Sequence, residues 1–150
     1  MITGYDIEAV LPHAHPMILL SEFVEAGESH AHCRVTVAPD SPFFDPATES
    51  VPSYVGVEYM AQTIAAFAGA NALASGEEVK IGFLLGCRKY QPEVTRFYQG
   101  SVLEVRAEKL MMDESGLSVF ACRIDQDDKL LVEARLNVFQ PEDHQAWLAE

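Results

Sequence analysis

The longest apolar stretch of the chain has the periodicity of a helix. Residues 53–74 repeat apolar side chains at the spacing of one helical face, namely Val57, Met60, Ala61, Ile64, Ala65 and Ala68. The opposite face is also apolar, and a helix that is apolar all round must be buried all round. Ser53 suits the N-cap position, and Ser75-Gly76 suits the end of the helix. We therefore expect one long central helix.

Alternating patterns on both sides of this helix predict strands. Residues 17–25 predict a strand. Residues 30–38 place Ala31, Cys33, Val35 and Val37 on one face and His30, His32, Arg34 and Thr36 on the other, which we expect to be exposed. After the helix, residues 79–90, 101–112, 116–125 and 129–139 have strand patterns, and turns at 113–116 and 125–128 indicate an antiparallel meander.

The remaining segments predict little regular structure. Residues 4–16 allow one helical turn at most, because Pro12 and Pro16 end it. Residues 39–52 carry four prolines and predict a loop, and a loop of this length tends to be functional. Residues 141–150 predict a short polar tail. The order of elements indicates a single α+β domain over residues 1–150, in which one antiparallel sheet curls around the helix and an uncovered sheet edge favours pairing with a second subunit.

Composition narrows the classes of function. The formal net charge of −13 argues against a nucleic-acid binder and against docking on an anionic membrane. The three cysteines have no CxxC pairing, so neither a disulfide framework nor a zinc or other metal site is expected. Polar residues interrupt the helix, which argues against a membrane span, and no secretory signal is visible. A cytoplasmic protein fits these features best.

Glu58 is the ionisable side chain that stands out in the helix. It is the only Asp, Glu, Lys, Arg or His between Pro52 and Gly76. Burial of a lone carboxylate is costly and raises its pKa, which makes it a competent proton donor near neutral pH. Gln62 lies one turn further on and can hydrogen-bond to Glu58. The alternative is that Glu58 interacts with the helix dipole near its start, where water can reach it.

Several segments together resemble one enzyme family. VPSYVGVEYMAQ (51–62) resembles the FPGVLxxEAMAQ helix start of the FabZ and FabA 3-hydroxyacyl-carrier-protein dehydratases. LPHAHPMILL (11–20), PFF (42–44) and KYQPEVTRFYQGSVLEV (89–105) resemble further motifs of that family, in the same order and over most of the chain. The resemblance implies the hotdog fold, a curved antiparallel sheet around one central helix, with a dimer and sites at the dimer interface.

The resemblance also implies a reaction. The family eliminates water from 3-hydroxyacyl thioesters carried on acyl carrier protein or CoA, with no other cofactor, in fatty acid or polyketide assembly. Glu58 takes the position of the family's catalytic carboxylate and would be the acid, while N–H groups at the helix start would stabilise the thioester oxygen. Gln62, Ser53, Gly56 and Tyr59 are expected to contact the substrate.

One departure from the family affects the base. The family has a histidine in a GHFP loop before the helix, whereas residues 45–50 are DPATES. His13, which matches the family's histidine in the LPHxxP segment, is the candidate replacement, with His15 as a weaker one and a structural role for His13 as the alternative. LPHxxPM, a shortened loop and GVEYMAQ together resemble the ApeP-type branch, associated with aryl polyene assembly and with heteromeric pairing.

The sequence is also consistent with two other functions, and it contains one candidate binding surface. The missing histidine is consistent with a non-catalytic hotdog subunit that completes a partner's site, in a homodimer or a heterodimer. A hotdog thioesterase would also use a carboxylate on this helix. Arg88, Lys89 and Arg96 form the densest basic group and are candidates to bind a carrier protein or its phosphopantetheine, although a solvated loop explains them equally well.

Overall fold

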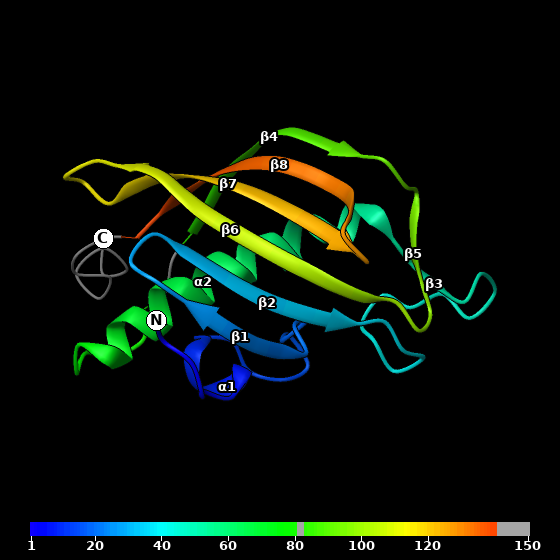
Figure 1. The fold of residues 1–150 in the computed structure, drawn as a ribbon, viewed down its shortest axis with the longest axis horizontal. Coiled ribbons are helices and arrows are strands. Elements are labelled where there is room, and N and C mark those ends of the chain that lie inside the picture. The colour runs from blue at the N-terminus through cyan, green and yellow to red at the C-terminus, as the bar shows by residue number, and fades with distance from the viewer. Residues whose placement is uncertain (81–82, 141–150) are drawn as a thin grey trace, which may run out of the picture.

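A six-stranded antiparallel sheet curves around one long helix, as expected (Figure 1). The computed structural model describes residues 1–80 and 83–140. The strand order is β1-β2-β6-β7-β8-β4, and β3 and β5 form a separate two-stranded ribbon. The strands are β1 (Glu22–Ala26), β2 (His30–Thr36), β3 (Ser50–Pro52), β4 (Phe83–Pro92), β5 (Arg96–Tyr98), β6 (Val102–Met112), β7 (Leu117–Gln126) and β8 (Lys129–Phe139). The helices are α1 (Ile7–Val10), a 3₁₀ turn η1 (Ser53–Val55) and α2 (Gly56–Ala74).

The central helix begins differently from the prediction and ends as predicted. Ser53 lies in the 3₁₀ turn and caps nothing with its side chain, and the N-cap residue of α2 is Val55. The expected Ser53 N-cap is therefore wrong, because the chain enters α2 through an extra turn. At the other end, Gly76 has a φ of +75° and its N–H donates to the carbonyl of Leu73 at 3.1 Å. This left-handed residue ends the helix in the way that glycine favours.

The helix is covered on most of its circumference, but not on all of it. Residues around most of the helix are buried, including Met60, Ile64, Ala66 and Ala70. Gly69 lies so close to the backbone of Val10 in α1 that a β-carbon would collide with it. Glu58, Ala61, Ala65 and Ala68 keep intermediate exposure. The expectation of burial on all sides is thus wrong for this one face.

The sheet follows the predicted alternation, with one change in strand order. The inward row of β2 is fully buried, with Ala31, Cys33 and Val35 at most 2% exposed. Strands β6, β7 and β8 form the expected meander. The strand after the helix, β4, does not begin that meander but pairs with β8, so it forms one edge of the sheet. The alternation along the chain predicts which side chains of a strand face inward, whereas the order of the strands in the sheet depends on pairing between distant segments.

The strand predicted at residues 17–25 begins only at Glu22. Ser21 already donates its amide to the carbonyl of Arg34 in β2 at 2.8 Å, but backbone groups of Met17 and Leu19 bond to the helix instead. The amide of Leu19 donates to Oε1 of Gln62 at 2.9 Å, and the carbonyl of Met17 accepts from Nε2 of Gln62 at 2.7 Å. This side chain thereby ties residues 17–19 to α2 and delays the start of β1.

Candidate functional site

A cavity of about 320 Å³ runs beside the exposed face of α2. Its floor is one helical stripe, Glu58, Ala61, Ala65 and Ala68, and its walls include Phe67, Phe120, Val138 and His13. Because a helix rises about 1.5 Å per residue, this stripe is about 15 Å long. The volume lies in the range of small-molecule sites, and the lining is mostly apolar with a few polar groups, which is typical of ligand pockets.

Glu58 lies at one end of this stripe. Its side chain is half-buried rather than enclosed, so the expected complete burial is wrong. The reason is local: α2 presents this face to the cavity, which separates it from residues of β7 and β8 such as Phe120 and Val138. Nε2 of Gln62 donates to Oε1 of Glu58 at 3.3 Å, which confirms the predicted contact one turn apart. Among the described residues this long bond is the one that the Glu58 side chain receives, so its carboxylate oxygens can also contact a ligand in the cavity.

Gln62 connects the carboxylate to the rest of the fold. It is 1% exposed and uses both ends of its amide, on Leu19 and Met17 as well as on Glu58. The backbone contacts hold the amide in one orientation, so its remaining N–H points at Glu58. The helical spacing predicts only the contact with Glu58. The two contacts to residues 17–19 depend on how the N-terminal segment packs.

His13 lines the same cavity as Glu58. The segment that carries it is fixed by Leu11, which is buried at 5% exposure, and by Gln62 through Met17 and Leu19. Nδ1 of His13 is buried and has no hydrogen-bond partner among the described residues. A buried ring nitrogen without a protein partner is uncommon, and such a group in a cavity can bond to a ligand or to water. The two side chains that the sequence predicts as the catalytic pair thus line one cavity, and their catalytic role stays a prediction.

The other described histidines lie elsewhere. His15 is exposed and bonds to Glu8 at 3.2 Å on the surface. His30 bonds to Glu25 at 3.2 Å, and His32 bonds to Glu104 at 2.7 Å, both on the face of the sheet away from α2. The predicted exposure of His32 is wrong, because its neighbours cover it to 9% exposure. His144 lies outside the described residues. Among the histidines that the structure describes, His13 is the one at the cavity.

The start of the helix leaves fewer free amides than expected. The amide of Ser53 donates to the carbonyl of Thr95 at 2.9 Å, and that of Gly56 donates to the carbonyls of Ser53 and Tyr54. The carbonyl of Ser53 also accepts a short hydrogen bond from the hydroxyl of Tyr90, a group whose pKa burial raises. These two amides therefore stabilise the turn itself, and an oxyanion would need other donors.

None of the four predicted substrate contacts lines the cavity, and Gln62 reaches it only through its bond to Glu58. Gly56 packs where a β-carbon would meet the Tyr90 hydroxyl, and Tyr59 is 2% exposed with its ring 6.0 Å from that of Phe97. Burial raises the pKa of Tyr59 to about 12, so its hydroxyl stays protonated at neutral pH. Ser53 is buried at 7% exposure. Their assignment as substrate contacts stays a prediction, and in this chain they support the turn that precedes Glu58.

The predicted basic group divides into two parts. Arg96 donates to the hydroxyls of Thr48 and Ser50 at 3.1 and 3.2 Å and lies 4.0 Å from Asp45, so it ties down the loop that replaces the family's histidine loop. Arg88 and Lys89 are exposed on β4. Carrier-protein binding by these three residues stays a prediction, and the structure gives Arg96 a separate role in holding the loop.

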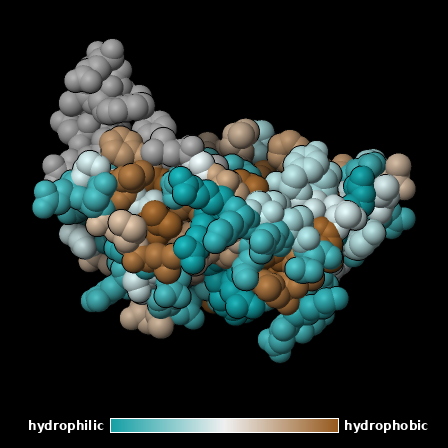
Figure 2. All heavy atoms as spheres, turned by 90° about the horizontal axis from the view of Figure 1, so that it is seen from above, coloured by the Kyte–Doolittle hydropathy of each residue, from teal (hydrophilic) through white to brown (hydrophobic). Residues whose placement is uncertain are grey.

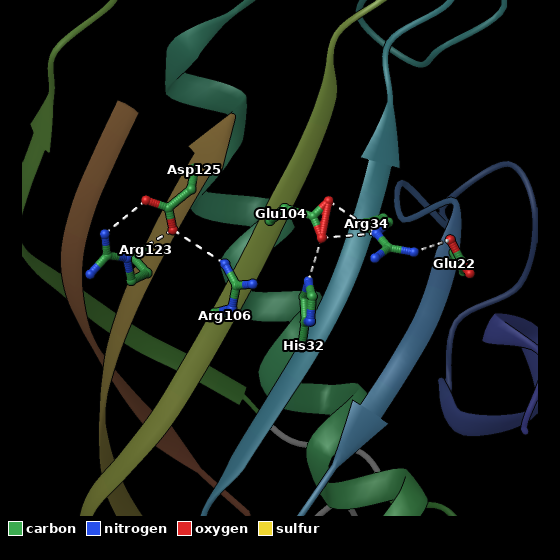
Figure 3. A network of polar contacts seen from close by, with 7 residues as sticks. All are labelled: Glu22, His32, Arg34, Glu104, Arg106, Arg123 and Asp125. Carbon is green, nitrogen blue, oxygen red and sulfur yellow. Dashed lines mark hydrogen bonds and ion pairs between the residues drawn. The ribbon is translucent and has the colours of Figure 1, made fainter. Parts of the chain in front are cut away.

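A charged network covers the opposite face of the sheet. Glu104 accepts from His32 at 2.7 Å and from Nε of Arg34 at 2.8 and 3.0 Å (Figure 3). Asp125 accepts from Arg123 at 2.8 Å and lies 3.4 Å from Arg106. In Figure 3 the helix lies behind the strands that carry these residues. Burial alone would raise the pKa of Glu104, but hydrogen bonds from Arg34 and His32 lower it below its usual value.

Other cavity residues gave no signal in the sequence. Ser118 is 6% exposed and lines the wall, and Lys80 lies at the end of the cavity away from Glu58. Phe67 and Phe120 meet edge to face, with ring centroids 5.6 Å apart. The alternation of β7 predicts that Ser118 and Phe120 face inward. Only the curvature of the sheet shows that they line a cavity rather than the core.

The fold and this site define the class of protein. A curved antiparallel sheet around a single buried helix, with a carboxylate near the start of that helix, is the hotdog architecture expected of the dehydratases. The ApeP-like family of ApeP dehydratases matches residues 5–149. The chain belongs to this family and is a hotdog protein of the 3-hydroxyacyl dehydratase type.

Solved structures agree with this assignment. The dehydratase heterocomplex ApeI:P from Xenorhabdus doucetiae contains a chain that is 33% identical, with a TM-score of 0.88 and 97% of both chains covered. Cj0977 from Campylobacter jejuni is 15% identical with a TM-score of 0.64, covering 91% of this chain and 89% of its own. A hypothetical thioesterase from Streptococcus pneumoniae TIGR4 is 11% identical with a TM-score of 0.62, covering 79% and 84%. The last two share the fold alone. No curated protein matches the sequence.

Proposed function

We propose that this chain catalyses the elimination of water from 3-hydroxyacyl thioesters, with Glu58 as the acid and His13 as the base. The proposal is supported by one observation above the others: Glu58 and His13, far apart in the sequence, line one apolar cavity. The family and the 33% identical chain of a dehydratase complex support the reaction class. We further propose that the substrate is carried on acyl carrier protein or CoA and that the chain works with a second hotdog subunit.

The elimination needs two proton transfers. A base removes the proton from the carbon next to the thioester carbonyl, and an acid protonates the hydroxyl on the following carbon as its C–O bond breaks, so that water leaves and a double bond forms. Nδ1 of His13 has no hydrogen-bond partner among the described residues, so in the tautomer in which this nitrogen is unprotonated its lone pair can accept the proton. Glu58 supplies the other proton and recovers one through His13 or water after the product leaves.

The cavity accommodates the rest of the substrate. The stripe Ala61, Ala65 and Ala68 offers small side chains along the helix, and an extended acyl chain can lie over them. Burial of apolar chain on these residues contributes roughly 25 cal/mol per Å². The thioester would then lie near Glu58 and the chain end toward Lys80. No helix among the described residues is long and apolar enough to cross a bilayer.

A non-catalytic subunit is the second candidate. The loop at residues 45–50 has no histidine, and Arg96 holds it through Thr48, Ser50 and Asp45. Such a subunit would place Glu58 in a cavity without using it for chemistry.

Turnover by the purified chain separates these candidates. The chain, alone and with its hotdog partner, is given a 3-hydroxyacyl thioester, and enoyl thioester and free thiol are measured separately. We expect enoyl product, reduced at least 100-fold by His13→Ala and unchanged by His15→Ala on the adjoining surface. Turnover by His13→Ala near that of wild type would show that the base is another group. Free thiol without enoyl product would indicate a thioesterase, and no product from the chain in either form would favour the non-catalytic subunit.

A further inference from the structure

A second cavity adjoins the one that contains Glu58. It has a volume of about 310 Å³ and lies at the C-terminal end of α2. The two cavities share five residues of their lining, namely Phe67, Ala68, Lys80, Met112 and Gln140. Because they share these residues, the second cavity begins where the first one ends. We call them the first and the second cavity.

Small side chains of α2 line both cavities in one row. The first cavity contains Ala61, Ala65 and Ala68, and the second adds Ala72 at the same helical spacing. At about 1.5 Å per residue, the row is about 15 Å long from Glu58 to Ala68 and about 21 Å long from Glu58 to Ala72. Alanine leaves space beside the helix that a larger side chain would fill. The row therefore extends the surface for an acyl chain beyond the first cavity.

Phe67 lies at the boundary between the two cavities. Its ring packs edge to face against Phe120, which lines only the first cavity, with centroids 5.6 Å apart. Nζ of Lys109, which lines only the second cavity, lies 5.4 Å from the centroid of the same ring. A cation over an aromatic face is attracted to it, so Lys109 favours this position of the ring. A ligand that enters the second cavity from the first must pass beside Phe67.

The outer end of the second cavity is polar and reaches the surface. Glu28, Ser75 and Glu77 are exposed members of its lining, and Met112 is 55% exposed. Hydrophobic and hydrophilic residues lie side by side at this end of the molecule (Figure 2), which carries the β6–β7 hairpin in Figure 1. The far end of a long chain would therefore meet water here rather than a closed wall.

We propose that the second cavity binds the far part of long acyl chains and that Phe67 determines how easily a chain passes into it. The proposal rests on the proposed function and names its substrate class, 3-hydroxyacyl chains that are longer than the first cavity. Three bonds of an extended chain span about 3.3–3.6 Å, so beyond the reacting carbons the first cavity covers roughly 13 bonds and both cavities together roughly 18.

Phosphopantetheine thioethers with alkyl chains are suitable probes, because they carry the arm common to CoA and acyl carrier protein and can neither lose water nor be hydrolysed. Octyl, tetradecyl and eicosyl thioethers are titrated into the chain, alone and with its hotdog partner, and the Kd is measured by calorimetry. Ala72→Phe fills the second cavity. Ala74→Phe is the matched control, because Ala74 is exposed on the same helix and lines neither cavity. Phe67→Leu removes the ring and keeps an apolar side chain.

Each buried methylene contributes up to about fourfold to affinity. In wild type we expect the Kd to fall from octyl to tetradecyl and again, at least tenfold, from tetradecyl to eicosyl. Ala72→Phe should abolish the second decrease and change the octyl Kd less than twofold, while Ala74→Phe should behave as wild type. Phe67→Leu should lower the eicosyl Kd at least threefold relative to the octyl Kd.

An eicosyl thioether that binds wild type no more tightly than the tetradecyl thioether would overturn the proposal, as would equal effects of Ala72→Phe and Ala74→Phe. An unchanged ratio of eicosyl to octyl Kd in Phe67→Leu would refute the role of Phe67. Because binding is measured without turnover, an inactive chain would refute the proposed function and leave this result standing.

Discussion

A glutamate and a histidine occur together on the outer face of the sheet, as Glu104 and His32, and in the cavity, as Glu58 and His13. The two places differ in how far these polar groups are hydrogen-bonded. On the outer face, His32 and Arg34 both donate to Glu104, and Arg34 also reaches Glu22 at 3.3 Å. In the cavity, Glu58 receives one hydrogen bond of 3.3 Å and Nδ1 of His13 receives none from the described residues. The outer pair is complete without a ligand, and the cavity pair is not.

This difference separates a structural pair from a reactive one. A buried polar group without a partner is costly, and folded proteins retain few of them. A buried ring nitrogen of His13 without a partner among the described residues, in the same cavity as the weakly bonded Glu58, is consistent with a site where a ligand provides the missing partner. The outer network uses the same residue types for cross-strand stabilisation, so residue type alone does not identify the site.

Replacing Glu58 and Glu104 in turn is the strongest test of the difference between the cavity site and the outer network. Glu58→Gln keeps the shape of the side chain but removes the transferable proton, so we expect turnover of a 3-hydroxyacyl thioester to fall about 10²–10⁴-fold. Glu104→Gln removes a charge from the outer network and should lower turnover less than twofold while lowering the urea concentration at which the protein unfolds. Both variants are assayed for enoyl product and for unfolding by urea.

Two results would contradict the expected difference between Glu58 and Glu104. If Glu104→Gln lowers turnover as much as Glu58→Gln does, the two pairs are not separate in function. If Glu58→Gln remains active and folded, the carboxylate is not the acid, whatever its position in the cavity.

Gln62 joins the cavity pair to the fold and should show a mixed effect. Gln62→Leu leaves the amide of Leu19 and the carbonyl of Met17 without their partner and releases Glu58. Each buried group left unsatisfied costs about 1–3 kcal/mol, so we expect a loss of roughly 2–4 kcal/mol in the free energy of unfolding. Asn71→Leu, which removes a bond to Gly27 from the far end of the helix, is the matched control. A role in aiming Glu58 predicts that only Gln62→Leu also lowers kcat in the folded fraction.

Sequence patterns predict much of the fold because burial follows periodicity. The helix at 53–74 and the inward row Ala31, Cys33 and Val35 are where the patterns put them. The place of β4 beside β8 and the short strand β5 are not predicted, since strand order depends on contacts between distant segments. The late start of β1 depends on Gln62, whose bonds to Met17 and Leu19 cross about 45 residues.

The candidate site is predictable in part for a different reason. Glu58 is detectable because a charge within an apolar helix is anomalous, and His13 because of its motif. The partial exposure of Glu58 and the burial of His32 cannot be predicted from the sequence, because both depend on how the strands pack around these side chains. That Lys80 and Ser118 line the cavity also cannot be predicted from the sequence, because it depends on how the sheet curves.

The smallest expected effect is a change in how stability depends on pH, and it tests whether the outer pair is structural. Burial lowers the pKa of His32 below its usual 6.5, and Arg106 and Arg34 act in the same direction against the hydrogen bond with Glu104. As the pH falls below 6.5, the unfolded chain therefore takes up a proton that the folded chain does not, and stability decreases. The lowered pKa of Glu104 acts in the same direction, but only below its usual 4.5.

His32→Gln keeps an N–H donor for Glu104 and removes the titration, so its urea midpoint should fall less steeply from pH 7 downward than that of wild type. His15→Gln, on the surface, should retain the wild-type slope, and an unchanged slope in His32→Gln would mean that another group governs this pH range.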